Sequence, residues 1–136
     1  MDMGDQGRSV FISHAYADRE FAARLTNALA QSGARAWLDS VELKPGDHWD
    51  EAILTSLRAS DIVVFVVPER EGAGKNALAE LGAARALGKK IVAVVPNAGR
   101  FHNADVARLL SGSAVVDAST LPDDALVNAI MRPLAA

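Results

Sequence analysis

The middle of this chain carries an unbroken run of large apolar residues, Ile62-Val63-Val64-Phe65-Val66-Val67. A strand with one solvated face alternates apolar and polar residues, whereas a central parallel strand has helices on both faces and is apolar throughout. Pro68 and the charged, Gly-rich segment 69–74 end the run and indicate a loop. The run therefore predicts the central strand of a parallel sheet that is covered on both sides.

Shorter apolar runs on both sides of this strand predict four more strands, centred on Val10–Ile12, Ala36–Leu38, Ile91–Val95 and Ala114–Val116. Apolar residues at helical spacing predict helices that run from Asp18 to Gly33, from Asp47 through Leu57, from Lys75 to Gly88 and from Pro122 to Leu134. The segment 98–110 is ambiguous, with a weak helical pattern in its second half. Strands and helices thus alternate, and right-handed crossovers favour an open, doubly wound, mostly parallel sheet of order 2-1-3-4-5.

Length and composition limit the classes of protein that remain. The 136 residues fit one domain, expected over 9–136 after a flexible lead-in of 1–8. The formal net charge is −3, and the sequence contains no cysteine. These features argue against nucleic-acid binding and exclude disulfides and cysteine-ligated metals. No signal peptide or long apolar segment is evident, so we expect a cytoplasmic protein without a membrane partner.

The predicted sheet places its ligand crevice beyond the carboxyl ends of the first and third strands, where the strand order reverses. Three segments converge there: the loop after the first strand, the end of the second strand with its long loop, and the helix after the third strand. The candidate ligand-binding residues are Ser13, His14, Tyr16, Trp37, Asp39, Asn76 and Glu80. The remaining histidines, His48 and His102, are too scattered to indicate a metal site.

Glu80 is the candidate catalytic residue because it is a lone carboxylate in a helix of small apolar residues. The predicted buried stripe of this helix is Ala77, Leu81, Ala84 and Gly88, and Glu80 lies about 100° away from Leu81 around the axis. The pattern therefore predicts a residue at the border of the buried face. Its neighbours at i−3, i+3 and i+4 are alanines, so the helix itself leaves room beside the carboxylate for a ligand.

Three groups of these residues resemble the signature boxes of a TIR domain, particularly of the bacterial type. They are Phe11-Ile12-Ser13-His14-Ala15, Trp37-Leu38-Asp39 with Leu43-Lys44-Pro45-Gly46-Asp47, and Asn76-Ala77-Leu78-Ala79-Glu80-Leu81-Gly82. The resemblance covers nearly the whole chain in the expected order. It implies a flavodoxin-like fold and, in catalytic members, cleavage of NAD between nicotinamide and ribose or cyclisation of the product, with Glu80 at the position of the catalytic glutamate.

The chemistry of NAD is compatible with a single carboxylate. Most glycosidases need a second carboxyl group to protonate the leaving oxygen, but nicotinamide is already cationic in NAD and departs neutral. Glu80 is therefore sufficient as an electrostatic partner, ribose anchor or nucleophile. NAD is then the substrate, and no resident cofactor or metal is expected. Trp37 offers an aromatic wall for a ring, and Ser13, His14 and backbone N–H groups offer donors to the pyrophosphate.

Each candidate residue also has a purely structural interpretation. Glu80 fits a solvated helix carboxylate, Trp37 fits core packing, and Asn76 fits a helix N-cap. His14 fits a histidine that forms only local hydrogen bonds. Asn76 also departs from many NAD-cleaving TIR domains, which have an aromatic residue four positions before the glutamate. The segment Glu80-Leu81-Gly82-Ala83-Ala84 is similar to nucleoside deoxyribosyltransferases as well, which also attack an N-glycosidic bond with a glutamate.

The resemblance implies two classes of function. The first is an NAD-consuming enzyme, a hydrolase or cyclase in bacterial defence signalling that is active on assembly. The second is a non-catalytic scaffold that associates with other TIR domains. In both, the loop residues Leu43, Lys44, Pro45 and Gly46 are the candidate self-association surface. Head-to-tail contacts through that loop predict a homo-oligomer or filament, with a sensor domain or partner protein that supplies the trigger.

Overall fold

The chain folds into one parallel sheet between two layers of helices. The computed structural model describes residues 8–38, 49–67, 75–96 and 113–135. Its strands pair in parallel in the order β2-β1-β3-β4-β5. They are β1 (Ser9–Ser13), β2 (Arg35–Leu38), β3 (Ile62–Val66), β4 (Lys90–Val95) and β5 (Ala114–Asp117). The helices are α1 (Arg19–Gln31), α2 (Trp49–Ala59), α3 (Lys75–Ala86) and α5 (Asp123–Ala135), with short 3₁₀ helices η1 (Tyr16–Asp18) and η2 (Ala118–Thr120).

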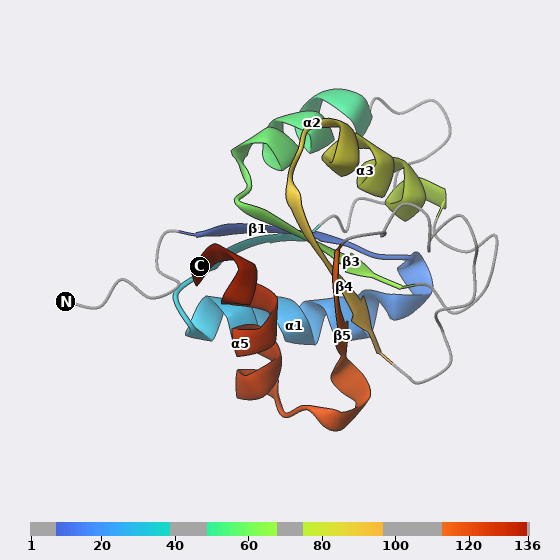
Figure 1. The fold of residues 1–136 in the computed structure, drawn as a ribbon. Helices are drawn as coiled ribbons and strands as arrows, with labels where there is room; N and C mark the ends of the chain where they lie inside the picture. Colours follow the sequence, from blue (N-terminus) through green and yellow to red (C-terminus); the bar gives the residue numbers. More distant parts are fainter. Residues whose placement is uncertain (1–7, 39–48, 68–74, 97–112, 136) are drawn as a thin grey trace.

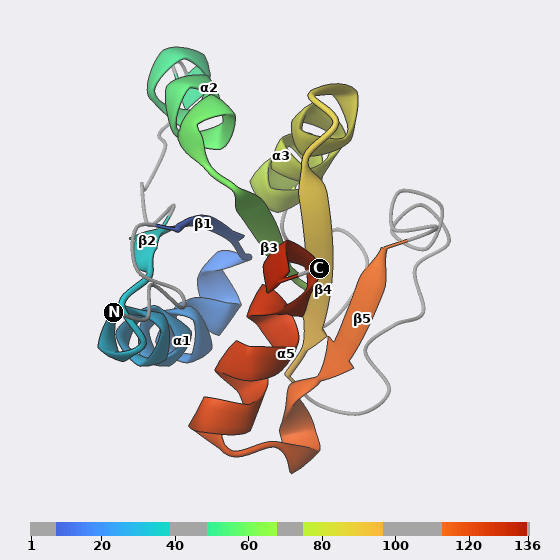
Figure 2. The same ribbon diagram turned by 60° about the vertical axis from the view of Figure 1, so that its left-hand side comes forward.

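Helices cover both faces of the sheet, as the apolar run in β3 predicts. Helices α2 and α3 lie on one face, and α1 and α5 lie on the other (Figure 1). Figure 2 shows the twist of the sheet from β2 at one edge to β5 at the other. All five residues of β3 are completely buried. The predicted doubly wound, flavodoxin-like architecture and its strand order are therefore confirmed.

Side chains alternate between two hydrophobic clusters, one on each face. In β1, Phe11 packs into the cluster on the side of α2 and α3, which also contains Phe65 and Leu81. Val10 and Ile12 pack into the cluster on the side of α1 and α5. Because side-chain directions alternate along a strand, the face of β1 that carries Phe11 also carries Ser13. This alternation directs Ser13 toward the layer that contains α3.

The helix boundaries follow the signals in the sequence. Helix α3 ends at Ala86, and Gly88 adopts the left-handed conformation with φ of +71°. Glycine reaches this region without steric cost, which explains the stop. In α5, the predicted inward residues Leu126 and Ile130 are buried. In α1, Leu25 and Leu29 are buried, while Phe21 is partly buried against the same cluster.

Some predictions lie outside the described residues. They concern the lead-in up to residue 7, the helical pattern in 98–110, and the N-cap at Asp47. Arg8 directly precedes β1, and its carbonyl oxygen accepts a hydrogen bond of 2.7 Å from the Arg35 N–H. The strand itself begins at Ser9, and the predicted bounds of the lead-in and the domain stay predictions. Within the described part of the chain, no helix has the length and apolar character needed to cross a bilayer.

A local pH dependence is expected at the end of β5. Asp117 accepts hydrogen bonds from the backbone N–H and the hydroxyl of Ser119, at 2.9 and 2.6 Å. These bonds, the hydroxyl first, lower the pKa of the Asp117 carboxyl below its ordinary value of 3.8. A lowered folded pKa means that the stabilisation is present above the unfolded pKa and is lost as the pH falls through the folded pKa. Asp117→Ala should therefore lower the melting temperature slightly at neutral pH.

Melting curves at several pH values check this expectation. The difference between wild type and Asp117→Ala should shrink as the pH falls below about 4, because the wild-type carboxyl then becomes protonated. Thr120→Ala, a change at an exposed neighbour in η2, serves as the control. A difference that stays constant down to strongly acidic pH would contradict the assignment to the carboxylate.

Candidate active site

A hydrogen bond between β1 and α3 is the central feature of the site. The hydroxyl of Ser13 donates to Oε1 of Glu80 at 2.6 Å, across 67 residues of sequence. Ser13 is the last residue of β1 and pairs in register with Phe65 of β3. The bond therefore lies at the carboxyl ends of β1 and β3, where the strand order reverses. This is the place at which doubly wound sheets bind their ligands.

Glu80 is buried, which corrects the prediction of a border residue with room beside it. Only 1% of Glu80 is exposed, and it ranks among the largest fully buried side chains of the described part of the chain. Ala84 follows Glu80 by four residues and so lies on the same side of α3. Because Ala84 and Leu81 are both completely buried, Glu80 shares the inner face with them. The interpretation of Glu80 as a solvated carboxylate is wrong as well.

The pattern of one helix alone does not show this burial. Small neighbours leave space beside a side chain within one helix, but in the folded protein Glu80 is only 1% exposed. Helix α3 packs against β1, β3 and β4, and also against α2. The sequence signal for the pairing was a serine at the end of a buried apolar strand. The sequence placed this serine and the helix after the third strand at the same crevice, but the direct bond between Ser13 and Glu80 is visible only in the tertiary structure.

The bond between Ser13 and Glu80 is short. Hydroxyl donors approach carboxylates at about 2.5–2.7 Å, closer than they approach neutral acceptors. The 2.6 Å between Ser13 Oγ and Glu80 Oε1 falls in this range. Removing a charge from water is costly unless hydrogen bonds replace the lost solvation. The buried Glu80 therefore needs hydrogen-bond donors, and the Ser13 hydroxyl is one of them.

His14 follows Ser13 and is also fixed locally. Its Nδ1 lies 2.8 Å from the carbonyl oxygen of Ala15. A carbonyl oxygen only accepts, so Nδ1 carries the proton, and in the neutral ring Nε2 is left as an acceptor. Nε2 is buried and has no hydrogen-bond partner among the described residues. The local hydrogen bond that the structural interpretation predicted is confirmed, and one ring nitrogen remains available for a donor group.

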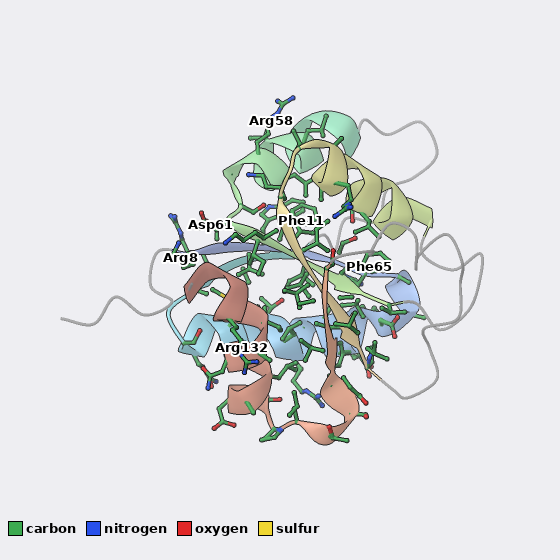
Figure 3. All side chains as sticks on the ribbon, in the orientation of Figure 1. Arg8, Phe11, Arg58, Asp61, Phe65 and Arg132 are labelled. Atoms are coloured by element: carbon green, nitrogen blue, oxygen red, sulfur yellow. The ribbon has the colours of Figure 1, made fainter. Side chains whose placement is uncertain are left out.

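Trp37 packs on the same face of the sheet. Its ring stacks on Phe11, with the centroids 4.8 Å apart and an angle of 22° between the planes. Trp37 is partly buried against the cluster that contains Phe11 and Phe65, and these two phenylalanines lie in the interior in Figure 3. The core-packing role of Trp37 is therefore confirmed. Contact with a ligand through the rest of the indole stays a prediction.

The other candidates are placed only in part. Tyr16 lies in η1, directly after the Ser13–His14 pair, and Asn76 lies in the first turn of α3, four residues before Glu80. Asp39 and the self-association residues lie outside the described residues, so their roles stay predictions. Within the described ranges, no three His, Cys, Asp or Glu side chains gather in a way that suits a metal ion.

The fold and the site together define a flavodoxin-like α/β domain with a buried carboxylate at the carboxyl ends of its central strands. A sequence model of the family described as TIR domain matches residues 10–130. The chain therefore belongs to the TIR domain family, which confirms the resemblance seen in the sequence motifs.

A curated relative extends this comparison. The protein named "Probable 2' cyclic ADP-D-ribose synthase BdTIR" from Brachypodium distachyon is 30% identical over 124 residues. The match covers 89% of this chain and 53% of that protein. This chain thus spans about half the length of the curated relative that it matches.

Solved structures show the same fold at low sequence identity. The TIR domains of the activated Roq1 resistosome superpose with a TM-score of 0.65 at 17% identity, covering 94% of this chain and 99% of that chain. The CMP N-glycosidase BcmB from Clostridium botulinum superposes with a TM-score of 0.60 at 17% identity, covering 95% of this chain and 100% of that chain. A response regulator from Thermotoga maritima superposes with a TM-score of 0.60 at 16% identity, covering 95% of this chain and 98% of that chain. At these identities the likeness concerns the fold alone.

Proposed function

We propose that this TIR domain is an NAD-consuming enzyme that cleaves the bond between nicotinamide and ribose, with Glu80 as the catalytic carboxylate. The observation that carries the proposal is the buried Glu80, held by the Ser13 hydroxyl at the carboxyl ends of β1 and β3. The relative from Brachypodium distachyon, whose name denotes a synthase of cyclic ADP-ribose, supports the same substrate class.

The reaction requires little from the protein beyond one negative charge. The bond from ribose C1′ to the nicotinamide nitrogen breaks, its electron pair goes to the cationic ring, and nicotinamide leaves as a neutral molecule. Positive charge then develops on the ribose. The Glu80 carboxylate stabilises that charge electrostatically or attacks C1′, and a preorganised buried charge is effective in this role. Attack by water gives ADP-ribose, whereas attack by a hydroxyl of the same molecule gives a cyclic product.

The bond to be broken favours NAD over an ordinary nucleoside. A neutral nucleobase leaves readily only when an acid protonates it, as in most glycosidic cleavage. In NAD the leaving group is already charged, so the Ser13–Glu80 pair needs no added acid. This is why we rank NAD above the deoxyribosyltransferase-like alternative, although CMP belongs in the assay as a second substrate because a CMP N-glycosidase shares the fold.

Access to the carboxylate is the second part of the proposal. Glu80 is closed off in this conformation, with 1% of its surface exposed, so NAD must displace atoms that cover it. A rearrangement on self-association meets this requirement, and the resistosome with TIR domains of the same fold supports an assembled active form. We therefore propose a homo-oligomer as the active species. The contribution of Leu43, Lys44, Pro45 and Gly46, the sensor partner, the defence role and the cytoplasmic location remain predictions.

Chromatography of NAD incubated with the concentrated protein tests the function. We expect nicotinamide to appear together with linear or cyclic ADP-ribose, at a rate per protein molecule that rises with protein concentration or with crowding. Parallel incubations with CMP and with a deoxynucleoside measure the alternatives. Failure to release nicotinamide at any degree of self-association would overturn the proposal, and it would favour the scaffold, for which Leu43→Ala or Pro45→Ala should abolish association.

His14 offers a prediction of its own. If the buried Nε2 accepts a hydrogen bond from the substrate, His14→Ala should raise the KM for NAD about five- to tenfold, the usual worth of one such bond. Asn128→Ala on the exposed side of α5 is the control. Steady-state kinetics on both variants make the comparison. Unchanged kinetics in a folded His14→Ala protein would restrict His14 to its local bond with Ala15.

A further inference from the structure

The residue that holds Glu80 is itself held rigidly. Ser13 ends the interior strand β1, pairs in register with Phe65 of the central strand β3, and is completely buried. Glu80 belongs to a separate element, the helix α3, and its side chain has three rotatable bonds. The Ser13 hydroxyl that the sheet places on it comes from a residue with one rotatable bond. The sheet thus supplies the fixed end of the contact, and the helix supplies the adjustable end.

We propose that Ser13 is a positioning residue for the reaction: its hydroxyl holds the Glu80 carboxylate in the orientation in which it faces ribose C1′. The inference rests on the proposed function. Catalytic groups must be held within a fraction of an ångström of their working geometry, usually by hydrogen bonds from rigid elements. A serine at the end of an interior strand meets that requirement, since neighbouring strands fix its backbone.

The same contact argues against the role first expected for Ser13, that of a ligand for the pyrophosphate. A serine hydroxyl carries one proton, and Ser13 donates it to Glu80. Phosphate oxygens at neutral pH are acceptors and need a donated proton. Ser13 therefore bonds a pyrophosphate only by releasing Glu80, which would leave a buried carboxylate without this donor. Positioning and substrate binding are thus competing roles, and kinetics separates them.

Three substitutions at position 13 vary the donor while they keep a small side chain. Ser13→Ala removes the hydroxyl, Ser13→Cys replaces it with a weak donor, and Ser13→Thr retains it. A hydrogen bond to a charged group corresponds to roughly ten- to hundredfold in rate. We therefore expect kcat for NAD cleavage to fall by about this factor in Ser13→Ala and Ser13→Cys, with KM nearly unchanged, and to be largely retained in Ser13→Thr.

A second background shows whether the effect passes through Glu80. In Glu80→Asp the carboxylate is one methylene shorter and withdraws from Ser13. The change Ser13→Ala should therefore lower kcat by a much smaller factor in the Glu80→Asp protein than in the wild type. Such non-additivity marks two residues that act as a unit. Melting curves on every variant ensure that kinetics are compared between folded proteins.

The outcomes are distinct. A fall in kcat that depends on Glu80 and is avoided by threonine supports the inference. A raised KM with unchanged kcat in Ser13→Ala would overturn it and return Ser13 to substrate binding, and unchanged kcat and KM would overturn it as well. If wild-type protein in the assembled state cleaves no NAD, the proposed function fails together with the inference. If Glu80→Gln is inactive but Ser13→Ala retains full kcat, only the inference fails.

Discussion

Glu80→Gln is expected to lower the rate of nicotinamide release from NAD by on the order of a thousandfold or more. Glutamine has nearly the shape of glutamate and still accepts the Ser13 hydroxyl, so the change removes the charge and little else. Without that charge, neither electrostatic stabilisation of the ribose cation nor attack at C1′ is possible. Losses of this order are typical when the group that stabilises the developing charge is removed.

The fold should survive this substitution. A buried charge contributes little to stability, because its desolvation offsets its interactions, and neutral replacements of similar volume are often harmless. We expect the melting temperature of Glu80→Gln to stay within a few degrees of the wild type or to rise. A residue whose loss abolishes activity without lowering stability is one that the protein keeps for function. Melting curves and the NAD assay on the same preparation measure both properties.

Glu20→Gln is the matched control for this experiment. Glu20 lies in the first turn of α1, is exposed, and belongs to the helix layer on the opposite face of the sheet. The same chemical change at that position should leave turnover within about twofold, as expected for a surface site remote from the reaction. Full turnover in a folded Glu80→Gln protein would remove Glu80 from the mechanism. Equal losses in both variants would point to a general effect of net charge.

Phe11→Ala should cause the largest loss of stability among simple truncations near the site. Phe11 is completely buried in the interior strand β1, packs in the same cluster as Phe65 and Leu81, and stacks on Trp37. Truncation of a buried phenylalanine costs about 3–5 kcal/mol from lost burial and the cavity that remains. Because domains of this size are stable by only about 5–15 kcal/mol, this variant should be close to unfolding at ambient temperature.

Urea unfolding followed by circular dichroism measures the free energy of unfolding of this variant. Phe11→Leu keeps most of the apolar volume and should lower the free energy of unfolding much less than Phe11→Ala. Val115→Ala on β5, where 53% of the valine is exposed, should lower it by under about 1 kcal/mol. A Phe11→Ala protein as stable as Val115→Ala would show that the cluster beneath Trp37 is not a tightly packed core. It would also weaken the case that Trp37 is a rigid wall of the site.

The arrangement of the sheet could be predicted because its signals are local. The six apolar residues from Ile62 to Val67 require cover on both faces, and they predicted a central strand without knowledge of its neighbours. Gly88 ends α3 through its own backbone freedom. The handedness of crossovers, a general property of polypeptides, then favoured a doubly wound sheet, for which 2-1-3-4-5 is a common strand order. These features depend on short stretches of chain, so the sequence contains them directly.

The state of the site depended on contacts between distant segments. Ser13 and Glu80 were both identified as candidates, but as a pyrophosphate ligand and as a carboxylate in an open setting. Their hydrogen bond joins residues 67 positions apart, and the complete burial of Glu80 depends on how α3 lies on β1, β3 and β4. Helical spacing gives the angle of a residue around the helix axis. It does not give how closely the helix packs on the sheet.

The amino-acid sequence by itself determined the order of the elements and the family, and it marked Glu80 as the candidate catalytic carboxylate. Periodicity, turn residues and motif spacing are properties of neighbouring residues, so they can be recognised from the sequence alone. Only the tertiary structure decided that this carboxylate is buried and that a strand-end hydroxyl holds it. The physical reason is that burial and hydrogen bonding between elements are set by the packing of the helix layer on the sheet, to which the whole chain contributes.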